Sequence, residues 1–268
     1  MNAPAPKIHC AVVTGASSGL GREFAIQLAP RAETIVLVAR RDSLLKELAS
    51  ELEESHPSLK VATVNCDLAE CEGRNYLLNF LSHENLYPDC LVNNAGMGDY
   101  GEFRTSDWEK TRSMIRLNME ALTHLTHALT PGLIAQKGAV INVSSLAGDL
   151  PIPDFAVYAA TKAYVTSFSE AIRLELRGYG VRVLAVCPGP VKTGFGDVAR
   201  RAITTKLPIQ ESFYVPASQV VEDSIRSLYL DQPRVYPGLK VAAVATLVGL
   251  LPMALIRLAM SNRPRRSE

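Results

Sequence analysis

The chain has 268 residues, a hydrophobic fraction of 47% and a formal net charge of +1. That length and apolar content suffice for one large core, so we expect a single domain. The nearly balanced charge disfavours nucleic-acid partners and acidic tails, which both need a strong excess of one sign. The N-terminal segment lacks the apolar run of a signal peptide, which predicts a cytoplasmic protein.

The five cysteines are scattered along the chain without C-x-x-C spacing. An odd number in this arrangement indicates reduced, intracellular thiols, and favours neither a disulfide framework nor a zinc ribbon. His124 and His127 form an i, i+3 pair, but two histidines without a third ligand are more typical of packing. We therefore predict no metal site.

Short apolar runs alternate with longer segments of helical character. The runs begin at Cys10, Thr34, Lys60, Cys90, Ala139 and Val181. Helical patterns lie between them, for example at 42–55 and 107–129. This alternation predicts an α/β fold with a doubly wound parallel sheet covered by helices on both faces.

Residues 11–28 pass from a strand through three glycines into a helix. Glycines let the backbone approach a pyrophosphate, whose charge then meets the free N–H groups and the positive dipole end of the helix. The spacing G-x-x-x-G-x-G differs from the generic dinucleotide fingerprint, and glycine also serves purely structural turns. We favour cofactor binding here by Gly15, Ser17, Ser18, Gly19, Leu20 and Gly21.

The second strand ends at Arg40 and Arg41, where an NAD-selective protein tends to carry an acidic residue for the ribose 2′-hydroxyl. Two guanidinium groups favour a 2′-phosphate instead, and hence NADP(H) over NAD(H). In the alternative interpretation both arginines are merely solvated and Asp42 caps the next helix.

Two tyrosines each stand four residues before a lysine: Tyr158 before Lys162, and Tyr236 before Lys240. The first pair lies in a segment of helical composition, so its two side chains share one helix face. The Pro-Gly pair at 237–238 prevents a continuous helix through the second pattern. We therefore interpret the second pattern as a coincidence.

The first pair has the chemistry of a proton-transfer site. A free phenol has a pKa near 10, and an ammonium about 6 Å away is expected to lower the pKa of Tyr158 by about 2. Ser145 stands thirteen residues earlier, at the end of the strand that begins at Ala139. It is placed to hydrogen-bond the same substrate oxygen, because ligands bind at the carboxyl edge of an open parallel sheet.

At this point the chain resembles the short-chain dehydrogenase/reductase family over nearly its whole length. The resemblance rests on TGASSGLG, NNAG, INVSS, YAATK and PGPVKT, which begin at residues 14, 93, 141, 158 and 188, and on the asparagine of RLNMEAL. The family's Ser-to-Tyr spacing of 13 selects Ser145 over Ser144. The resemblance implies a seven-stranded Rossmann sheet and a catalytic tetrad of Asn118, Ser145, Tyr158 and Lys162.

The resemblance also implies further cofactor contacts. Asp67 and Leu68 would lie at the adenine, the segment 93–96 at the adenosine ribose, and Lys162 at the nicotinamide ribose. The remaining cofactor positions are Asn94, Ala95, Gly96, Tyr158, Pro188, Gly189, Val191 and Thr193, with Val191 and Thr193 at the carboxamide. The implied reaction is reversible hydride transfer between a nicotinamide and a carbonyl carbon, with Asn118 holding a water that relays protons to Lys162.

Two other classes of protein compete with this interpretation. Extended relatives that modify nucleotide sugars share Tyr-x-x-x-Lys, but their glycine spacing and larger C-terminal domain do not match. A non-catalytic NADP(H)-binding regulator would most plausibly lack a proton-transfer residue, whereas all four are present here.

The alternation of elements fails between residues 193 and 216, where we expect a long, mobile substrate loop. Its apolar side chains predict either a lid over a lipophilic ketone or 3-oxoacyl substrate, or simple packing on the domain, with equal weight. They are Phe195, Val198, Ile203, Leu207, Ile209, Phe213 and Tyr214.

Residues 241–256 carry no charge, and this apolar stretch falls short of the about 20 residues needed to cross a bilayer. We expect one helix at about 240–260. Its bulky apolar side chains form one stripe that the protein can bury: Val244, Leu247, Val248, Leu251, Leu255 and Leu258.

The small, uncharged residues on the opposite face of this helix predict a second neighbour. We favour another subunit, since the family resemblance implies homodimers or homotetramers. The alternative is a membrane-associated, lipid-modifying reductase with basic residues at anionic headgroups: Arg257, Arg263, Arg265 and Arg266.

Overall fold

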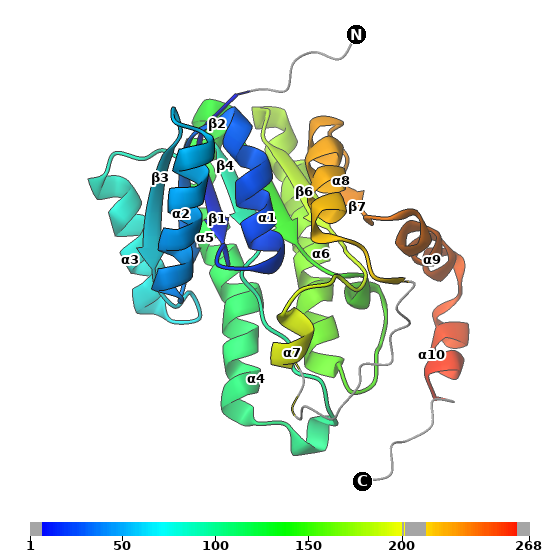
Figure 1. The fold of residues 1–268 in the computed structure, drawn as a ribbon. Helices are drawn as coiled ribbons and strands as arrows, with labels where there is room; N and C mark the ends of the chain where they lie inside the picture. The colour runs from blue at the N-terminus through cyan, green and yellow to red at the C-terminus, as the bar shows by residue number, and fades with distance from the viewer. Residues whose placement is uncertain (1–6, 200, 202–212, 262–268) are drawn as a thin grey trace.

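The computed structural model describes residues 7–199, 201 and 213–261, without the side chains of residues 197 and 198. Seven parallel strands form one sheet in the order β3-β2-β1-β4-β5-β6-β7 (Figure 1). The strands are β1 (Ile8–Thr14), β2 (Ala32–Ala39), β3 (Lys60–Asn65), β4 (Cys90–Asn93), β5 (Ala139–Val143), β6 (Arg182–Val186) and β7 (Arg234–Val235). The predicted doubly wound, seven-stranded parallel sheet is confirmed.

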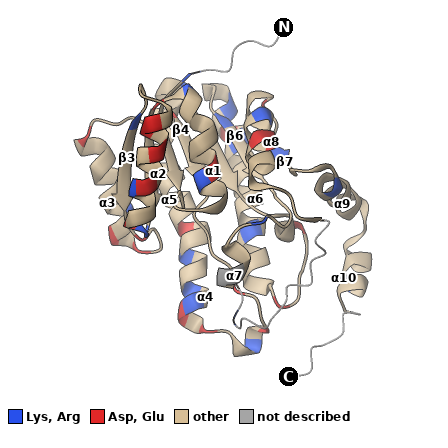
Figure 2. Cartoon of the chain, viewed as in Figure 1, with Lys and Arg blue, Asp and Glu red and all other residues tan. Residues whose placement is uncertain are grey.

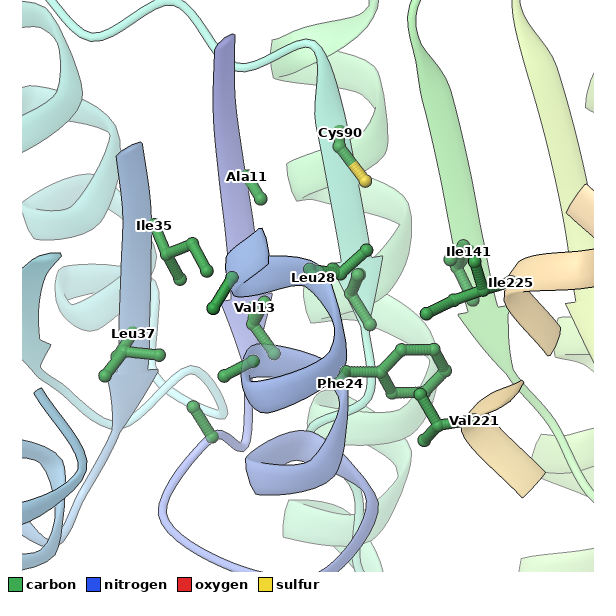
Figure 3. Packing of buried hydrophobic residues seen from close by; sticks show 14 of the residues in the cluster. Ala11, Val13, Phe24, Leu28, Ile35, Leu37, Cys90, Ile141, Val221 and Ile225 are labelled. Atoms are coloured by element: carbon green, nitrogen blue, oxygen red, sulfur yellow. The ribbon is translucent and has the colours of Figure 1, made fainter. Parts of the chain in front are cut away.

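Helices cover both faces of this sheet and enclose two apolar cores. The helices on one face are α1 (Gly19–Leu28), α2 (Asp42–Ser55) and α8 (Ala217–Tyr229). Those on the other face are α3 (Cys71–His83), α5 (Leu122–Gln136) and α6 (Ala156–Leu176). Alternate residues of β1 enter the two cores, because successive side chains of a strand point to opposite faces. Figure 3 shows Ala11 and Val13 in the first core, where Phe24 of α1 reaches toward Val221 of α8.

The strand order changes direction beside β1, which pairs with β2 on one side and with β4 on the other. At such a switch point the loops that follow the two neighbouring strands turn to opposite faces, leaving room for a ligand at the carboxyl edge of the sheet. The glycine-rich turn follows β1, and the segment 93–96 begins at the end of β4. The fold thus brings these two motifs to one place.

Shorter elements complete the region around this edge. A continuous helical rod consists of α4 (Trp108–Ile115), a π-helical turn η3 (Arg116–Ala121) and α5. The 3-10 turn η4 (Leu146–Asp149) follows β5, and α7 (Phe195–Ala199) follows the loop after β6. Within the expected substrate loop, Ile203, Leu207 and Ile209 lie outside the described residues, as does the side chain of Val198.

The alternative interpretation in which Asp42 caps α2 is wrong: Asp42 is the first helical residue, Arg41 holds the N-cap position, and the Asp42 carboxylate lies 2.6 Å from Lys46 one turn later. In addition, the apolar runs did not predict β7. This strand has two residues, too few to show a period, and only the family resemblance implied a seventh strand.

The C-terminal region forms two helices in place of the single helix expected at about 240–260. Helices α9 (Leu239–Leu250) and α10 (Met253–Ser261) are bent by 113° at a break before Pro252, because proline cannot donate the next helical hydrogen bond and favours an extended residue before it. Both helices lie beyond β7 at the side of the domain (Figure 1). Within the described ranges no single helix is long and apolar enough to span a membrane; only the bent pair passes that test together.

The face that these helices turn to the protein also differs from the expected one. The buried positions are Val241, Ala245 and Ile256. Most of the bulky stripe is exposed instead, in a surface with little charge (Figure 2). We call the following residues the C-terminal apolar surface: Leu239, Leu247, Leu250, Leu251, Met253, Leu255 and Leu258.

Candidate active site

Tyr158 and Lys162 lie one turn apart on α6, and both are buried. The Lys162 ammonium lies 5.8 Å from the centroid of the Tyr158 ring and donates a hydrogen bond to the carbonyl of Val143, 2.8 Å away. Because Val143 is the last residue of β5, this bond ties the lysine to the carboxyl edge of the sheet. The two side chains share one helix face, as the i, i+4 spacing predicts.

Burial changes the protonation chemistry that we expected for this pair. It raises the pKa of Tyr158 to about 12, with the hydrogen bond to Ser145 acting in the opposite direction. Burial also lowers the pKa of Lys162 to about 8. The expectation that Tyr158 has a lowered pKa is therefore wrong for this arrangement, because burial of the phenol disfavours its charged form.

The structure separates the roles of the two serines after β5. The hydroxyl of Ser144 is buried and bonds to the Lys162 carbonyl and the Thr166 hydroxyl, each at 2.7 Å. Ser145 is half-buried and is the N-cap of η4, where its hydroxyl accepts from the Ala147 amide at 3.1 Å and also hydrogen-bonds with Tyr158. The serine selected by the spacing of 13 is thus the one whose hydroxyl meets the tyrosine, and its neighbour anchors α6 to β5.

Asn118 lies in the π-helical turn η3, where α4 continues into α5. Its amide group donates to the Met97 carbonyl at 2.9 Å and to the Thr161 hydroxyl at 3.0 Å, while its oxygen accepts from the Met97 amide at 3.0 Å. With its side chain engaged in this way, a water at Asn118 would be held by the main-chain carbonyl. A π-helical turn frees main-chain groups of this kind and is frequent at functional sites.

The glycine-rich turn fits a pyrophosphate. Gly15 and Gly19 have positive φ values of 67° and 57°, which side chains rarely adopt. A Cβ atom on Gly21 would lie 2.3 Å from the Gly15 carbonyl. Ser18 is the N-cap of α1 but makes no side-chain capping bond, so the first N–H groups of the helix remain directed at the space an anion would take. Ser17 and Leu20 complete the turn.

A threonine that the motifs did not single out joins this turn to the segment 93–96. The Thr14 hydroxyl donates to the Val92 carbonyl and accepts from the amides of Asn94 and Ala95, at 2.9 to 3.1 Å. Gly96 comes close to the tetrad, because a Cβ there would lie 3.5 Å from the Lys162 ammonium. The available signal for Thr14 was its place at the end of the first strand, as the first residue of TGASSGLG.

The two arginines after β2 differ in their surroundings. Arg41 lies against the glycine-rich turn and donates to the hydroxyls of Ser17 and Ser18 at 2.8 and 2.7 Å. Arg40 is 69% exposed and makes one long contact of 3.4 Å with Asp67. Arg41 is therefore the better-held guanidinium at the edge where a 2′-phosphate would sit, and Arg40 is free to turn toward it.

The adenine-side positions follow β3. Asp67 accepts a hydrogen bond from the Ala69 amide at 3.0 Å, and Leu68 is buried. Arg74, which the sequence analysis missed, is also buried; it donates to the Leu68 carbonyl at 3.0 Å and pairs with Glu120. By binding main-chain carbonyls, the buried Arg74 holds the loop after β3 in place. No motif or spacing in the sequence predicts this role.

The loop after β6 is held from two sides. The Pro188 carbonyl accepts from the Leu146 amide at 2.9 Å, which links the loop to η4. Gly189 packs so closely on α9 that a Cβ there would lie 2.7 Å from Val241. The same loop carries the two positions expected at the carboxamide, Val191 and Thr193.

Aromatic rings surround the tyrosine. Phe155 and Phe195 lie 4.7 and 5.6 Å from the Tyr158 ring, and Tyr100 lies 5.2 Å from Phe155. Phe195 begins α7, so this short helix covers the side chain of Tyr158, which is 7% exposed. The surroundings of the phenol are therefore apolar.

Hydrogen bonds to the segment after β4 hold α7 in this position. The Ala199 carbonyl accepts from the Tyr100 amide at 2.8 Å. Arg201 donates to the buried Asp99 carboxylate at 3.1 Å, and Lys110 pairs with the same carboxylate at 2.9 Å. These contacts lower the pKa of Asp99, although its burial acts in the opposite direction. The carboxylate is thus charged and paired.

Tyr236 does not share a helix face with Lys240. Gly238 lies between them with a φ of 86° and is the N-cap of α9, so the chain turns there, as the Pro-Gly pair predicted. The Tyr236 hydroxyl donates instead to the Asp149 carboxylate of η4, 2.6 Å away. The second tyrosine is therefore engaged with the turn that follows Ser145.

Among residues 7–199, 201 and 213–261, no group of three or more His, Cys, Asp or Glu side chains could hold a metal ion. What the structure assembles is an open parallel sheet, a glycine-rich turn without a side-chain cap, and a Ser-Tyr-Lys group at one edge. These features define the class of nucleotide-dependent oxidoreductases with a Rossmann fold.

Comparison with known proteins agrees with this class. The family model for short chain dehydrogenases matches residues 9–203. A very-long-chain 3-oxoacyl-CoA reductase of Rattus norvegicus is 33% identical over 216 residues, 79% of this chain and 68% of that protein. One of Laccaria bicolor is 35% identical over 176 residues, 65% of this chain, but the match spans only about half (52%) of that protein.

A solved structure extends the likeness to almost the whole fold. A short-chain dehydrogenase from Sphingobium yanoikuyae, in complex with NADPH, has a TM-score of 0.79 and 29% identity, and the match covers 97% of this chain and 98% of that one. The chain belongs to the short-chain dehydrogenase/reductase family. It is an oxidoreductase of that family.

Proposed function

We propose that the protein interconverts a carbonyl group and a secondary alcohol by hydride transfer, with NADP(H) as its cofactor. The observation that carries this proposal is the grouping of Ser145, Tyr158 and Lys162 beside the glycine-rich turn. A bound nicotinamide supplies or accepts the hydride. In reduction, Ser145 holds the carbonyl oxygen and Tyr158 gives it a proton. Lys162 then returns a proton to the phenolate, and a water held at Asn118 relays a proton to Lys162.

The protonation states suit the reduction. With its pKa raised to about 12, Tyr158 carries its proton at neutral pH. With a pKa lowered to about 8, Lys162 is still mostly charged there, yet releases its proton more readily than an ordinary lysine. A proton donor and a group that reprotonates it are thus both in place.

The preference for NADP(H) over NAD(H) rests on Arg40 and Arg41. We expect NADPH to bind at least about tenfold more tightly than NADH, a difference of about 1.4 kcal/mol. Arg41→Ala should remove most of this preference, because Arg41 is the better-held guanidinium, and Arg40→Asp should erode it by adding repulsion. Fluorescence titration with both cofactors measures the ratio, and equal affinities in the unmodified protein would exclude a role for the arginines in selectivity.

The substrate class that we propose is a lipophilic ketone or a 3-oxoacyl compound. The aromatic surroundings of Tyr158 support it, as do the relatives named very-long-chain 3-oxoacyl-CoA reductases. In a series of methyl ketones, kcat/KM measured by NADPH oxidation should rise with chain length, by up to about fourfold per methylene. Phe195→Ala should flatten the rise, and Tyr76→Ala on the outer surface of α3 should not. A flat series in the unmodified protein contradicts this substrate class.

For the C-terminal apolar surface we propose a second copy of this chain, in a homodimer or homotetramer, and we keep the cytoplasm as the expected location. A membrane-lying helix usually opposes its apolar face with a strongly charged one, whereas α9 carries one charged residue, Lys240 (Figure 2). Leu250→Glu, at a position 78% exposed, should shift the mass measured by light scattering toward the monomer. An unchanged mass, with salt-sensitive binding of the intact chain to anionic liposomes, would favour peripheral membrane attachment.

A further inference from the structure

Tyr236 belongs to a hydrogen-bonded group that joins three separate elements. Its hydroxyl donates to one oxygen of Asp149 in η4 and accepts from Arg234 of β7, both at 2.6 Å. Arg234 also donates to the other Asp149 oxygen at 3.2 Å and to Glu170 of α6 at 2.9 Å. One guanidinium therefore bridges η4 and α6.

The group is sheltered enough to keep a fixed geometry. The side chains of Asp149 and Arg234 are 19% and 27% exposed. Burial raises the pKa of Tyr236, and its bond to Asp149 acts in the same direction, so the phenol stays protonated and keeps donating to the carboxylate. The planar fork of arginine adds direction to these bonds, because its donors point along fixed lines.

The hydrogen-bonded group of Tyr236, Arg234 and Asp149 contacts two elements that position residues of the tetrad. Ser145 is the N-cap of η4 and Asp149 is its last residue, and the Gly148 amide donates to the Ser145 carbonyl at 3.0 Å. Tyr158 lies on α6, the helix that carries Glu170. Arg234 thus adds a side-chain bridge between the turn that follows the serine and the helix that holds the tyrosine, which also pack directly on each other at Gly148 and Lys162.

We propose that Tyr236, Arg234 and Asp149 are positioning residues that fix Ser145 relative to Tyr158, and we call the three the clamp. The inference rests on the proposed function, in which both hydroxyls must reach one substrate oxygen. A misplacement of about 1 Å can cost up to about a hundredfold in rate. In this role the clamp acts through the turn and the helix, by the hydrogen bonds among Tyr236, Arg234, Asp149 and Glu170.

A double-mutant cycle tests this role. Tyr236→Phe removes a single oxygen, and we expect kcat to fall about tenfold, with the melting temperature and the affinity for NADPH nearly unchanged. In a Ser145→Ala background, the same substitution should cost less than about twofold, because the serine that it positions is gone. A purely structural contribution by Tyr236 predicts equal losses in both backgrounds, and that result would overturn the proposal, as would an unchanged kcat in the single variant.

One further variant tests the clamp independently, and another serves as a negative control. Arg234→Lys keeps the charge but cannot bridge Glu170 and Asp149 as a fork, so it should reproduce the loss in kcat even if Tyr236→Phe folds poorly. Tyr179→Phe, on a ring 57% exposed, should leave kcat unchanged. Absence of turnover in the unmodified protein with every ketone tested would refute the proposed function, whereas an active protein indifferent to Tyr236 and Arg234 would refute the clamp alone.

Discussion

The regions around Tyr158 and Tyr236 use the same side chain for opposite purposes. Tyr158 stands on an unbroken helix among aromatic rings, with an amine on the same face. Tyr236 stands between a two-residue strand and a turn, among the charged groups of Arg234 and Asp149. The first phenol has apolar surroundings and the second is held by ionic partners. A tyrosine's role thus depends on the backbone that follows it, because only a helix returns the fourth residue to the same face.

The largest expected difference between the two regions is catalytic. Tyr158→Phe should lower kcat by about 10² to 10⁴, the range for loss of a general acid, while the affinity for NADPH stays within a few-fold. A coincidental second pattern alone predicts little effect for Tyr236→Phe, whereas the clamp predicts a loss in kcat of about tenfold. Steady-state kinetics on one active ketone compares the two. Equal losses in both variants would contradict the assignment of the proton donor.

The two lysines should differ in their effect on the pH dependence of stability. Burial lowers the pKa of Lys162 to about 8 from 10.5, so between these values the unfolded chain holds a proton that the folded chain has lost. The contribution of Lys162 to the free energy of unfolding therefore rises with pH through this window, by up to about 3 kcal/mol.

Urea unfolding from pH 7 to 10 measures this contribution as the difference between the unmodified protein and Lys162→Met. Titrating groups that do not interact with Lys162 cancel in that difference, whereas Cys187, which raises the pKa of Lys162, contributes to it. Lys240→Met replaces the exposed lysine of the second pattern and serves as the matched comparison. A flat difference for Lys162→Met would mean that its amine is not buried as described.

The smallest expected effect concerns the glycine that separates Tyr236 from Lys240. Gly238 has a φ of 86°, and a Cβ there would lie 2.9 Å from Val215, so Gly238→Ala should destabilise the fold by about 1–3 kcal/mol. Gly132 lies inside α5 with open space around a Cβ, and Gly132→Ala should stabilise by about 0.5–1 kcal/mol. Thermal or urea unfolding measures the stability of both variants. A change in stability of the same sign in both would contradict the prediction.

Patterns that are local in the sequence predicted most of the fold. Six strands show as apolar runs because a sheet covered on both faces needs apolar side chains on both. The glycine-rich turn and Tyr158 with Lys162 depend on spacings of a few residues, and the structure brings them to one edge of the sheet. The strand β7 was too short to be found in this way, and the bend between α9 and α10 depended on how Pro252 would be accommodated.

Contacts between distant residues stayed hidden. Arg234 and Asp149 are far apart in the sequence, and no period or motif connects them. The pKa of Tyr158 was misjudged for a related reason: the sequence shows which charge stands four residues away, but not that Phe155 and Phe195 exclude water from the phenol. Burial is a property of the assembled fold and outweighed the local charge.

Because β7 lies near the end of the chain, its residues are synthesised after those of the tetrad. A ribosome adds about 5–20 residues per second, so Arg234 and Tyr236 emerge several seconds after Tyr158 and Lys162. A nascent chain that has extended through α6 already contains the glycine-rich turn and the whole tetrad, but its serine turn has no bridge to the helix. The bridge between the serine turn and α6 can therefore form only after β7 has been synthesised, later than every residue of the glycine-rich turn and of the tetrad.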